Sequence, residues 1–193
     1  MPRLSRRTKK IAFGAALLAG WAGSGFLVWQ ASYAAFSATT VNNGNSWSAG
    51  TVALTDDDSN SAMFTVTALK PGDTDEECIE VNYTGTLAAD VKLYSTAAHG
   101  GTGLDTYLDI TIEEGDGGEF GDCTGFAADG TIYTGTLAGF RSAPHTNYGN
   151  AVGTWAPGSA ETKTYKFTYT LQDNNAAQSL TTTAGFTWEA QNS

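Results

Sequence analysis

Alternation of apolar and polar residues is the feature of this chain that most restricts its fold. From Tyr165 to Leu171 the odd positions are apolar and the even ones polar, and the same period of two recurs at Ile79 to Tyr83, Leu108 to Ile112 and Ala184 to Ala190. Successive side chains of a strand point to opposite faces of a sheet, so this period is typical of antiparallel sheets with one buried face. The pattern therefore predicts an all-β domain.

Less regular alternation extends this prediction to about nine short strands. The additional strands are expected at Trp47–Leu54, Ala62–Ala68, Asp90–Ser95, Thr131–Thr136 and Asn150–Trp155. Turn sequences such as Lys70-Pro71-Gly72-Asp73 separate them, and no window after residue 35 carries a convincing helical period. We predict an antiparallel two-sheet β-sandwich of jelly-roll type. An immunoglobulin-like sandwich is the alternative, but no Trp lies between Cys78 and Cys123 as that fold would require.

Residues 1–34 have the layout of a secretory signal peptide. Five basic residues fall within the first ten positions, an uncharged apolar run extends from Ile11 to Trp29, and small residues precede a cleavage site between Ala34 and Ala35. The apolar run is also long enough to cross a bilayer, so an uncleaved membrane anchor is the alternative. Either interpretation predicts that the rest of the chain is secreted or displayed at the cell surface.

The charge of the exported part excludes one class of partner. From Ala35 onward the sequence has 5 basic and 20 acidic residues, a net charge of −15. Such a surface repels phosphate backbones, so we expect no nucleic-acid binding, and docking on anionic lipid is disfavoured.

Two cysteines, Cys78 and Cys123, lie in the exported part and are the only ones in the chain. Outside the cell an even number of cysteines usually forms disulfides, so we predict a Cys78–Cys123 bond. In the chain-entropy model, closing a loop of this span stabilises the fold by roughly 4 kcal/mol.

Motifs for catalysis are absent from the exported sequence, so we expect a protein without catalysis or a cofactor. Neither His99 nor His145 lies in a His-Glu-x-x-His motif, and there is no Gly-x-Ser-x-Gly nucleophile elbow. Three acids of a Gly-rich loop are candidate calcium ligands, although their spacing matches no calcium loop and an exposed acidic hairpin is the preferred interpretation. These candidates are Asp116, Glu119 and Asp122.

Exposed aromatic side chains could instead form a carbohydrate-binding surface. The candidates are Trp47, Trp155, Tyr133, Tyr148 and Phe140. Alternation with polar neighbours favours core positions for Trp47 and Trp155, so Tyr148, in the loop His-Thr-Asn-Tyr-Gly, is the best exposed candidate. A monomeric adhesin or carbohydrate-binding sandwich is therefore one alternative function.

Several short motifs carry a resemblance to a known family. They are Ala34-Ala35-Phe36-Ser37-Ala38-Thr39-Thr40, Asn45-Ser46-Trp47-Ser48-Ala49-Gly50-Thr51-Val52-Ala53-Leu54, Leu69-Lys70-Pro71-Gly72-Asp73 and Asn82-Tyr83-Thr84-Gly85-Thr86. In these segments the chain resembles the TasA/camelysin family of exported bacterial proteins. The segment from about residue 97 to 151 has no counterpart in that family.

The resemblance implies a jelly-roll fold, a signal peptide removed by a SipW-type signal peptidase, and a structural role in fibres of the biofilm matrix. Subunits of such fibres associate head to tail by β-strand addition, with an accessory fibre-anchoring protein as a further partner. The donor strand would be formed by Ala35, Phe36, Ser37, Ala38, Thr39, Thr40 and Val41. Residues 35–46 would then be an extension and residues 47–193 the sandwich domain. A surface metallopeptidase like camelysin is the alternative that the same resemblance implies, but this sequence has no recognisable zinc motif.

Overall fold

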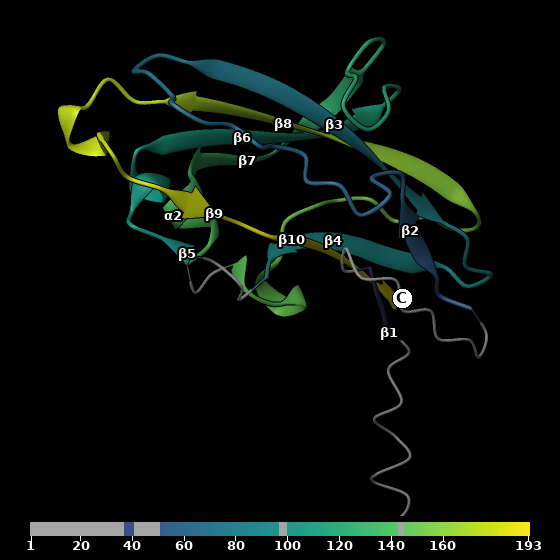
Figure 1. The fold of residues 1–193 in the computed structure, drawn as a ribbon. Helices are drawn as coiled ribbons and strands as arrows, with labels where there is room; N and C mark the ends of the chain where they lie inside the picture. The colour runs from purple at the N-terminus through teal and green to yellow at the C-terminus, as the bar shows by residue number, and fades with distance from the viewer. Residues whose placement is uncertain (1–36, 41–50, 97–99, 143–144) are drawn as a thin grey trace, which may run out of the picture. The chain divides into compact units, whose positions relative to one another are not determined.

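The computed structural model describes residues 37–40, 51–96, 100–142 and 145–193, and the chain divides into a unit of residues 1–35 and a unit of residues 36–193. The regular secondary structure of the second unit consists mainly of antiparallel strands (Figure 1). In the described part of the chain no helix has the length and apolar character to cross a membrane. The predicted signal peptide and its cleavage site between Ala34 and Ala35 lie outside the described residues.

The larger sheet has five strands in the order β2-β3-β8-β6-β7, all antiparallel to their neighbours. Its central strand β8 is the most regular alternating segment of the sequence, and it pairs with β3 and β6 over nearly its whole length. The strands are β2 (Leu54–Asp56), β3 (Thr74–Tyr83), β6 (Leu108–Asp116), β7 (Ala127–Thr136) and β8 (Glu161–Leu171).

A smaller sheet has the order β1-β10-β4, formed by β1 (Ser37–Thr40), β10 (Phe186–Asn192) and β4 (Ala89–Ser95). A third sheet is the short pair of β5 and β9. The remaining elements are β5 (Gly100–Gly101), β9 (Thr182–Thr183), the single helical turn α2 (Leu137–Phe140), and the 3₁₀ turns η1 (Leu104–Thr106), η3 (Tyr148–Asn150) and η4 (Asn175–Ala177).

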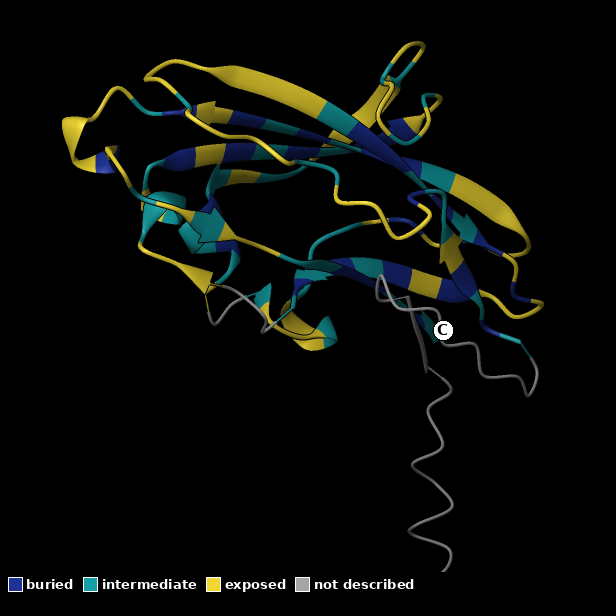
Figure 2. Cartoon of the chain, viewed as in Figure 1, coloured by how far each residue is buried: buried dark blue, intermediate teal, exposed yellow. Residues whose placement is uncertain are grey.

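One apolar core joins the two larger sheets. Tyr165 and Phe167 of β8 meet Trp188 of β10 at ring-centroid distances of 5.4 and 6.2 Å, and Phe167 also lies 4.6 Å from Phe186. Burial alternates along the strands as the period of two predicts (Figure 2). The expectation of a mostly β, antiparallel domain is confirmed, while the jelly-roll connection of the strands stays a prediction.

Two of the expected strands are wrong. Residues 62–68 form no strand in the structure, and Val66 is 44% exposed, because their apolar side chains cover an opening between the sheets instead of pairing along a ladder. Residues 150–155 contain one isolated bridge, between Val152 and Leu93, rather than a continuous strand. Of the strand expected at 47–54, only Leu54 falls in a described strand, and Trp47 lies outside the described residues.

The turn at Lys70 to Asp73 is confirmed. The Asp73 N–H donates to the Lys70 carbonyl at 2.9 Å, and the Lys70 N–H donates to Asp73 Oδ2 at 2.7 Å. Gly72 has φ +83°, a conformation that a residue with a Cβ rarely adopts. The turn leads directly into β3, which begins at Thr74.

Candidate functional site

The edge of the smaller sheet is the part of the structure that involves the predicted donor segment. Strand β10 lies in the middle of this sheet, with β4 on one side and β1 on the other (Figure 1). Along β1 the register runs from Ser37 opposite Gln191 to Thr40 opposite Trp188. Residues 188–191 of β10 therefore have a neighbouring strand on both sides.

The opposite edge of the sheet, along β4, is covered by the segment of residues 152–157. The N–H groups of Ala89, Val91 and Leu93 donate to carbonyls of this segment at 3.0, 2.8 and 2.7 Å, and Val152 donates back to the Leu93 carbonyl at 2.9 Å. Such coverage protects β4 from pairing with another chain. At the other edge of the sheet, the four-residue strand β1 lies along β10 in the same way as residues 152–157 lie along β4.

The two faces of β10 have different chemistry. Trp188 and Ala190 are buried in the core, whereas Glu189 is half-buried on the outer face. Tyr94 on β4 donates to Glu189 Oε2 at 2.9 Å, and Gln191 donates to Oε1 at 2.8 Å. Burial and this hydrogen bond to Glu189 raise the pKa of Tyr94 to about 12. A strand beside β10 thus lies at the margin of the apolar core, next to an ordered polar network.

The predicted donor segment is only partly described. Ser37, Ala38, Thr39 and Thr40 form β1 and pair with β10 of their own chain. Ala35, Phe36 and Val41 lie outside the described residues. Donation of this segment to a neighbouring subunit stays a prediction, but the strand conformation and a complementary edge are both present within one chain.

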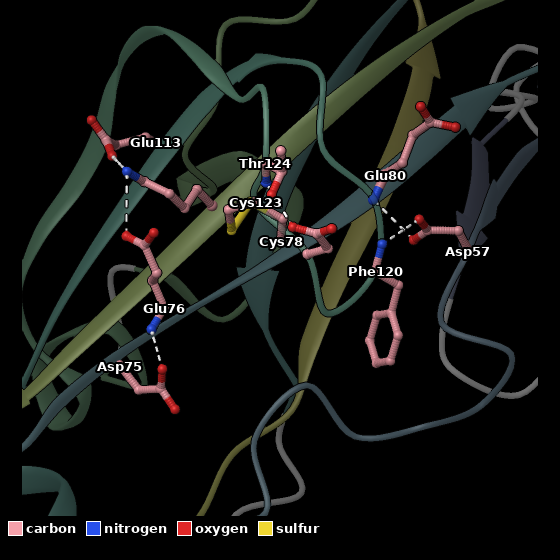
Figure 3. The surroundings of a disulfide bond; sticks show 11 residues. Asp57, Asp75, Glu76, Cys78, Glu80, Glu113, Phe120, Cys123 and Thr124 are labelled. Atoms are coloured by element: carbon pink, nitrogen blue, oxygen red, sulfur yellow. Dashed lines mark hydrogen bonds and ion pairs between the residues drawn. A yellow bond between two sulfur atoms is a disulfide. The ribbon is translucent and has the colours of Figure 1, made fainter.

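The disulfide between Cys78 and Cys123 is present in the structure and attaches the loop of residues 117–126 to β3. The two Cα atoms are 5.2 Å apart, and the Gly121 N–H donates to the Cys78 carbonyl at 3.1 Å. Asp57 fixes the same loop from the other side, because its carboxylate accepts from the N–H groups of Glu80 and Phe120 at 2.9 and 2.7 Å (Figure 3). Sequence reasoning missed this role of Asp57, whose partners are backbone groups.

The three calcium candidates of this loop do not form a common site. Asp116 pairs with Lys163 at 3.0 Å, and Asp122 accepts from the Thr124 N–H at 2.8 Å. Hydrogen bonds from the side chain and then the backbone of Thr124 lower the pKa of Asp122. Glu119 meets Asp122 through backbone hydrogen bonds. Throughout the described residues, no group of three or more His, Cys, Asp or Glu side chains is arranged to hold a metal ion.

The candidate histidines and aromatic residues take mainly structural positions. His145 stacks on Phe140 with a centroid distance of 5.5 Å, and its Nδ1 lies 3.0 Å from the Asn150 carbonyl oxygen. Tyr148 donates to the Asp90 carbonyl at 3.0 Å, and the Lys92 ammonium lies 4.9 Å from the centre of its ring.

Of the remaining aromatic candidates, Trp155 and Phe140 are buried in the core and Tyr133 is half-buried against it. The Tyr133 hydroxyl donates to the Thr136 carbonyl at 2.9 Å. His99 lies outside the described residues. The described aromatic candidates thus contribute to packing and do not form one exposed platform.

A family model described as camelysin metallo-endopeptidase matches residues 8–102. Residues 8–102 belong to the TasA/camelysin family. No curated protein matches the chain. The family match includes Cys78 and strands β1 to β4, whereas Cys123, His145 and strands β6 to β10 lie beyond it.

The metal that the camelysin family name implies has no matching ligand set in the described part of this chain. Of the two histidines, His145 lies outside the matched segment and is packed against Phe140. Asp56, Asp57 and Asp58 do not form a three-carboxylate ligand set, because both oxygens of Asp57 already accept backbone N–H groups. We therefore derive no peptidase mechanism from the described residues.

Proposed function

We propose that this protein is an exported structural subunit of an extracellular or cell-surface fibre, and that its subunits associate head to tail by β-strand addition. Strand β1 would be the donor and β10 the acceptor. The observation that carries the proposal is the pairing of β1 along residues 188–191 of β10, while the other edge of the sheet is covered by residues 152–157. Release of β1 would leave a single well-defined gap in the smaller sheet.

The energetics favour an exchange of this kind. A strand of four residues contributes few ladder bonds, so its release costs little compared with the rest of the fold. The vacated backbone groups of β10 would lie beside the buried Trp188 and Ala190 and would need new partners. The same segment of a second chain would restore the same ladder, so protein concentration decides between the closed monomer and a chain of subunits.

The family and the N-terminal sequence both support export of the protein. Family members are exported or cell-surface proteins, and residues 1–34 have the layout of a signal peptide. We infer cleavage between Ala34 and Ala35 by a SipW-type signal peptidase, which would free the donor segment. A jelly-roll connection of the strands and an accessory protein that anchors the fibre complete this proposal.

Polymerisation of two purified proteins tests the proposal. A protein that begins at Ala35 should form filaments that are visible by negative-stain microscopy at high concentration. A protein that lacks residues 36–40 keeps the acceptor edge but has no donor strand, so it should stay monomeric and should stop filament growth when it is added to the first protein. If the first protein stays monomeric at all concentrations, pH values and seeding conditions, the fibre proposal fails.

Cross-linking between subunits tests the position of the contact. Thr39 lies opposite Glu189, so protein with Thr39→Cys should form a disulfide with separate protein carrying Glu189→Cys after both are mixed and oxidised. Glu161→Cys, on an exposed end of β8, is the matched control and should not cross-link to Thr39→Cys. Equal cross-linking to both partners would show random contact and would contradict strand exchange at β10.

A surface metallopeptidase is the second candidate, and the printed description of the matching family model is the observation that favours it. Metal analysis of the purified protein and casein cleavage with and without a chelator test this alternative. Cleavage that is lost with chelator and restored by one metal would establish it, and filament formation by the same preparation would show that the two functions are compatible.

A further inference from the structure

A cavity of about 620 Å³ lies between the two larger sheets, and its lining includes Trp188, the residue of β10 that pairs with Thr40 of β1. This volume is within the range of small-molecule sites, roughly 300–1,000 Å³. Its walls are mostly apolar and include residues of β2, β3, β6, β8 and β10 of the two larger sheets. The main lining side chains are Ile79, Ile110, Phe167, Tyr169 and Phe186.

One side of this cavity is covered by residues 62–69, which we call the strap. Met63, Phe64 and Leu69 of the strap line the cavity, and Phe64 makes an edge contact with Tyr169 at 5.2 Å. Within the described residues, the strap contributes no donor or acceptor to a backbone hydrogen bond. Segments with few backbone hydrogen bonds open at low free-energy cost, so the strap provides a route into the cavity.

The cavity has one charged region, formed by Asp56 and Asp58. Asp58 is only 5% exposed, and its Oδ1 accepts from the Asn60 N–H at 2.7 Å. No Lys or Arg side chain lines the cavity, and the ion pairs of the described residues include neither of these carboxylates. A half-buried pair of acids without a cation is electrostatically costly and is stabilised by a bound positive charge.

The pKa of Asp56 agrees with this description. Burial, together with the neighbouring carboxylates of Asp58 and Asp57, raises the pKa of Asp56 to about 6. Asp56 and Asp58 are hydrogen-bonded to each other, and Asp58 also accepts from the Asn60 N–H, whereas both oxygens of Asp57 accept backbone N–H groups and Asp57 does not line the cavity. The negative charge that is available to a ligand is therefore the charge of Asp56 and Asp58.

We propose that the cavity binds an apolar molecule that carries one protonated amine, with its apolar body between the sheets and its ammonium group beside Asp56 and Asp58. Charge complementarity selects this class of ligand: the apolar walls favour an alkyl or aromatic body, and the acidic pair favours a cation and repels a carboxylate such as that of a fatty acid. The proposal does not depend on fibre formation.

Calorimetric titration of the protein that begins at Ala35 tests the proposal with decylamine, decanol and decanoate at pH 7.5, each below its micellar concentration. Decylamine should bind at least tenfold more tightly than decanol, and decanoate should bind least. Asp56→Asn should weaken decylamine binding at least tenfold and leave decanol binding unchanged. Asp173→Asn, which removes an exposed acid that does not line the cavity, is the matched control and should change neither affinity.

A second pair of variants tests the location without altering the acids. Ala184 is exposed and lies at the cavity wall, so Ala184→Trp should weaken both decylamine and decanol, whereas Ala160→Trp at an exposed site elsewhere should not. Urea unfolding of each variant checks that the fold is retained. Equal affinities for the three ligands, or decylamine binding that neither Asp56→Asn nor Ala184→Trp changes, would overturn the proposal.

Discussion

Thr154 donates to the buried carboxylate of Glu114 from both its backbone and its side chain. The Thr154 N–H lies 3.1 Å from each carboxylate oxygen, and the Thr154 hydroxyl lies 2.8 Å from Oε2. Glu114 is 3% exposed and follows a register shift between β6 and β7. This contact joins the larger sheet to the segment that covers the edge of β4.

Replacing Glu114 should therefore destabilise the whole domain. Hydrogen bonds to a charged group contribute about 1.5–3 kcal/mol, and Glu114→Gln replaces one acceptor oxygen with a donor that faces the donors of Thr154. We expect a loss of about 2–3 kcal/mol in the free energy of unfolding, measured by urea denaturation at pH 7. Thr154→Val, which removes only the hydroxyl bond to this carboxylate, should cost about 1.5 kcal/mol.

The matched control for this prediction is Glu161→Gln on the exposed end of β8, which should change the free energy of unfolding by less than about 0.5 kcal/mol. If Glu114→Gln and Glu161→Gln have the same effect, the contact between Glu114 and Thr154 does not support the sheet edge.

Removal of the disulfide should also destabilise the fold, although it should not alter the order of the strands. Cys78 and Cys123 are 45 residues apart, for which the chain-entropy model gives about 4 kcal/mol of stabilisation. The double variant Cys78→Ser with Cys123→Ser should unfold at a correspondingly lower urea concentration. Thiol titration of the unreduced, denatured native protein should detect no free thiol, and detection of two thiols would contradict the bond.

The period of two predicts the faces of the strands well but not their neighbours. The alternation that places Ile110 and Ile112 in the core also places Glu114 there, so this buried acid could have been found from the sequence. The alternation in residues 62–68 predicts a strand that the structure does not form, because a cover over a cavity and a strand can have similar composition. Strand order depends on contacts between distant residues, which alternation does not encode.

How much the sequence predicts differs between the disulfide, the contacts of Asp57 and the donor segment. The pairing of Cys78 with Cys123 follows from counting two exported cysteines. The role of Asp57 could not be predicted, because its partner Phe120 is a backbone N–H group 63 residues away along the chain. The resemblance implies that residues 35–41 are a donor strand. It could not show that residues 37–40 pair with β10 of their own chain, because that pairing joins residues that are distant in the sequence.

The pH dependence of stability should reveal the acidic pair in the cavity. The pKa of Asp56 is raised from 3.8 to about 6 in the folded state by burial and by Asp58 and Asp57, so between these values the folded protein binds more protons than the unfolded one. The contribution of Asp56 to stability therefore falls as the pH rises through this window. Asp56→Asn should be more stable than the native protein at pH 7.5, and the difference should shrink towards pH 4.

Urea unfolding of both proteins between pH 4 and 7.5 measures this difference. Glu77, whose pKa is raised by burial and by Asp75, contributes a similar trend to both proteins and cancels in the comparison. Asp173→Asn is the control and should parallel the native protein at every pH. A difference between Asp56→Asn and native protein that stays constant with pH would contradict the assignment.

Limited proteolysis should identify the strap of residues 62–69 as the segment that opens most easily. The chymotrypsin sites in described loops include Phe64 in the strap and Phe126 beside the disulfide, and both side chains are half-buried. The loop of Phe126 is held by Cys123, and Lys166 lies 5.3 Å from the Phe126 ring centre, whereas Phe64 makes one edge contact with Tyr169. Cleavage requires local opening, which costs less where fewer bonds must break.

Among the described residues, the first cut should therefore follow Phe64, as measured by the mass of the early fragments. Phe64→Ala should delay it, and Phe126→Ala should not. An earlier cut at Phe126 would show that the strap is the more stable of the two segments and would remove the proposed route into the cavity.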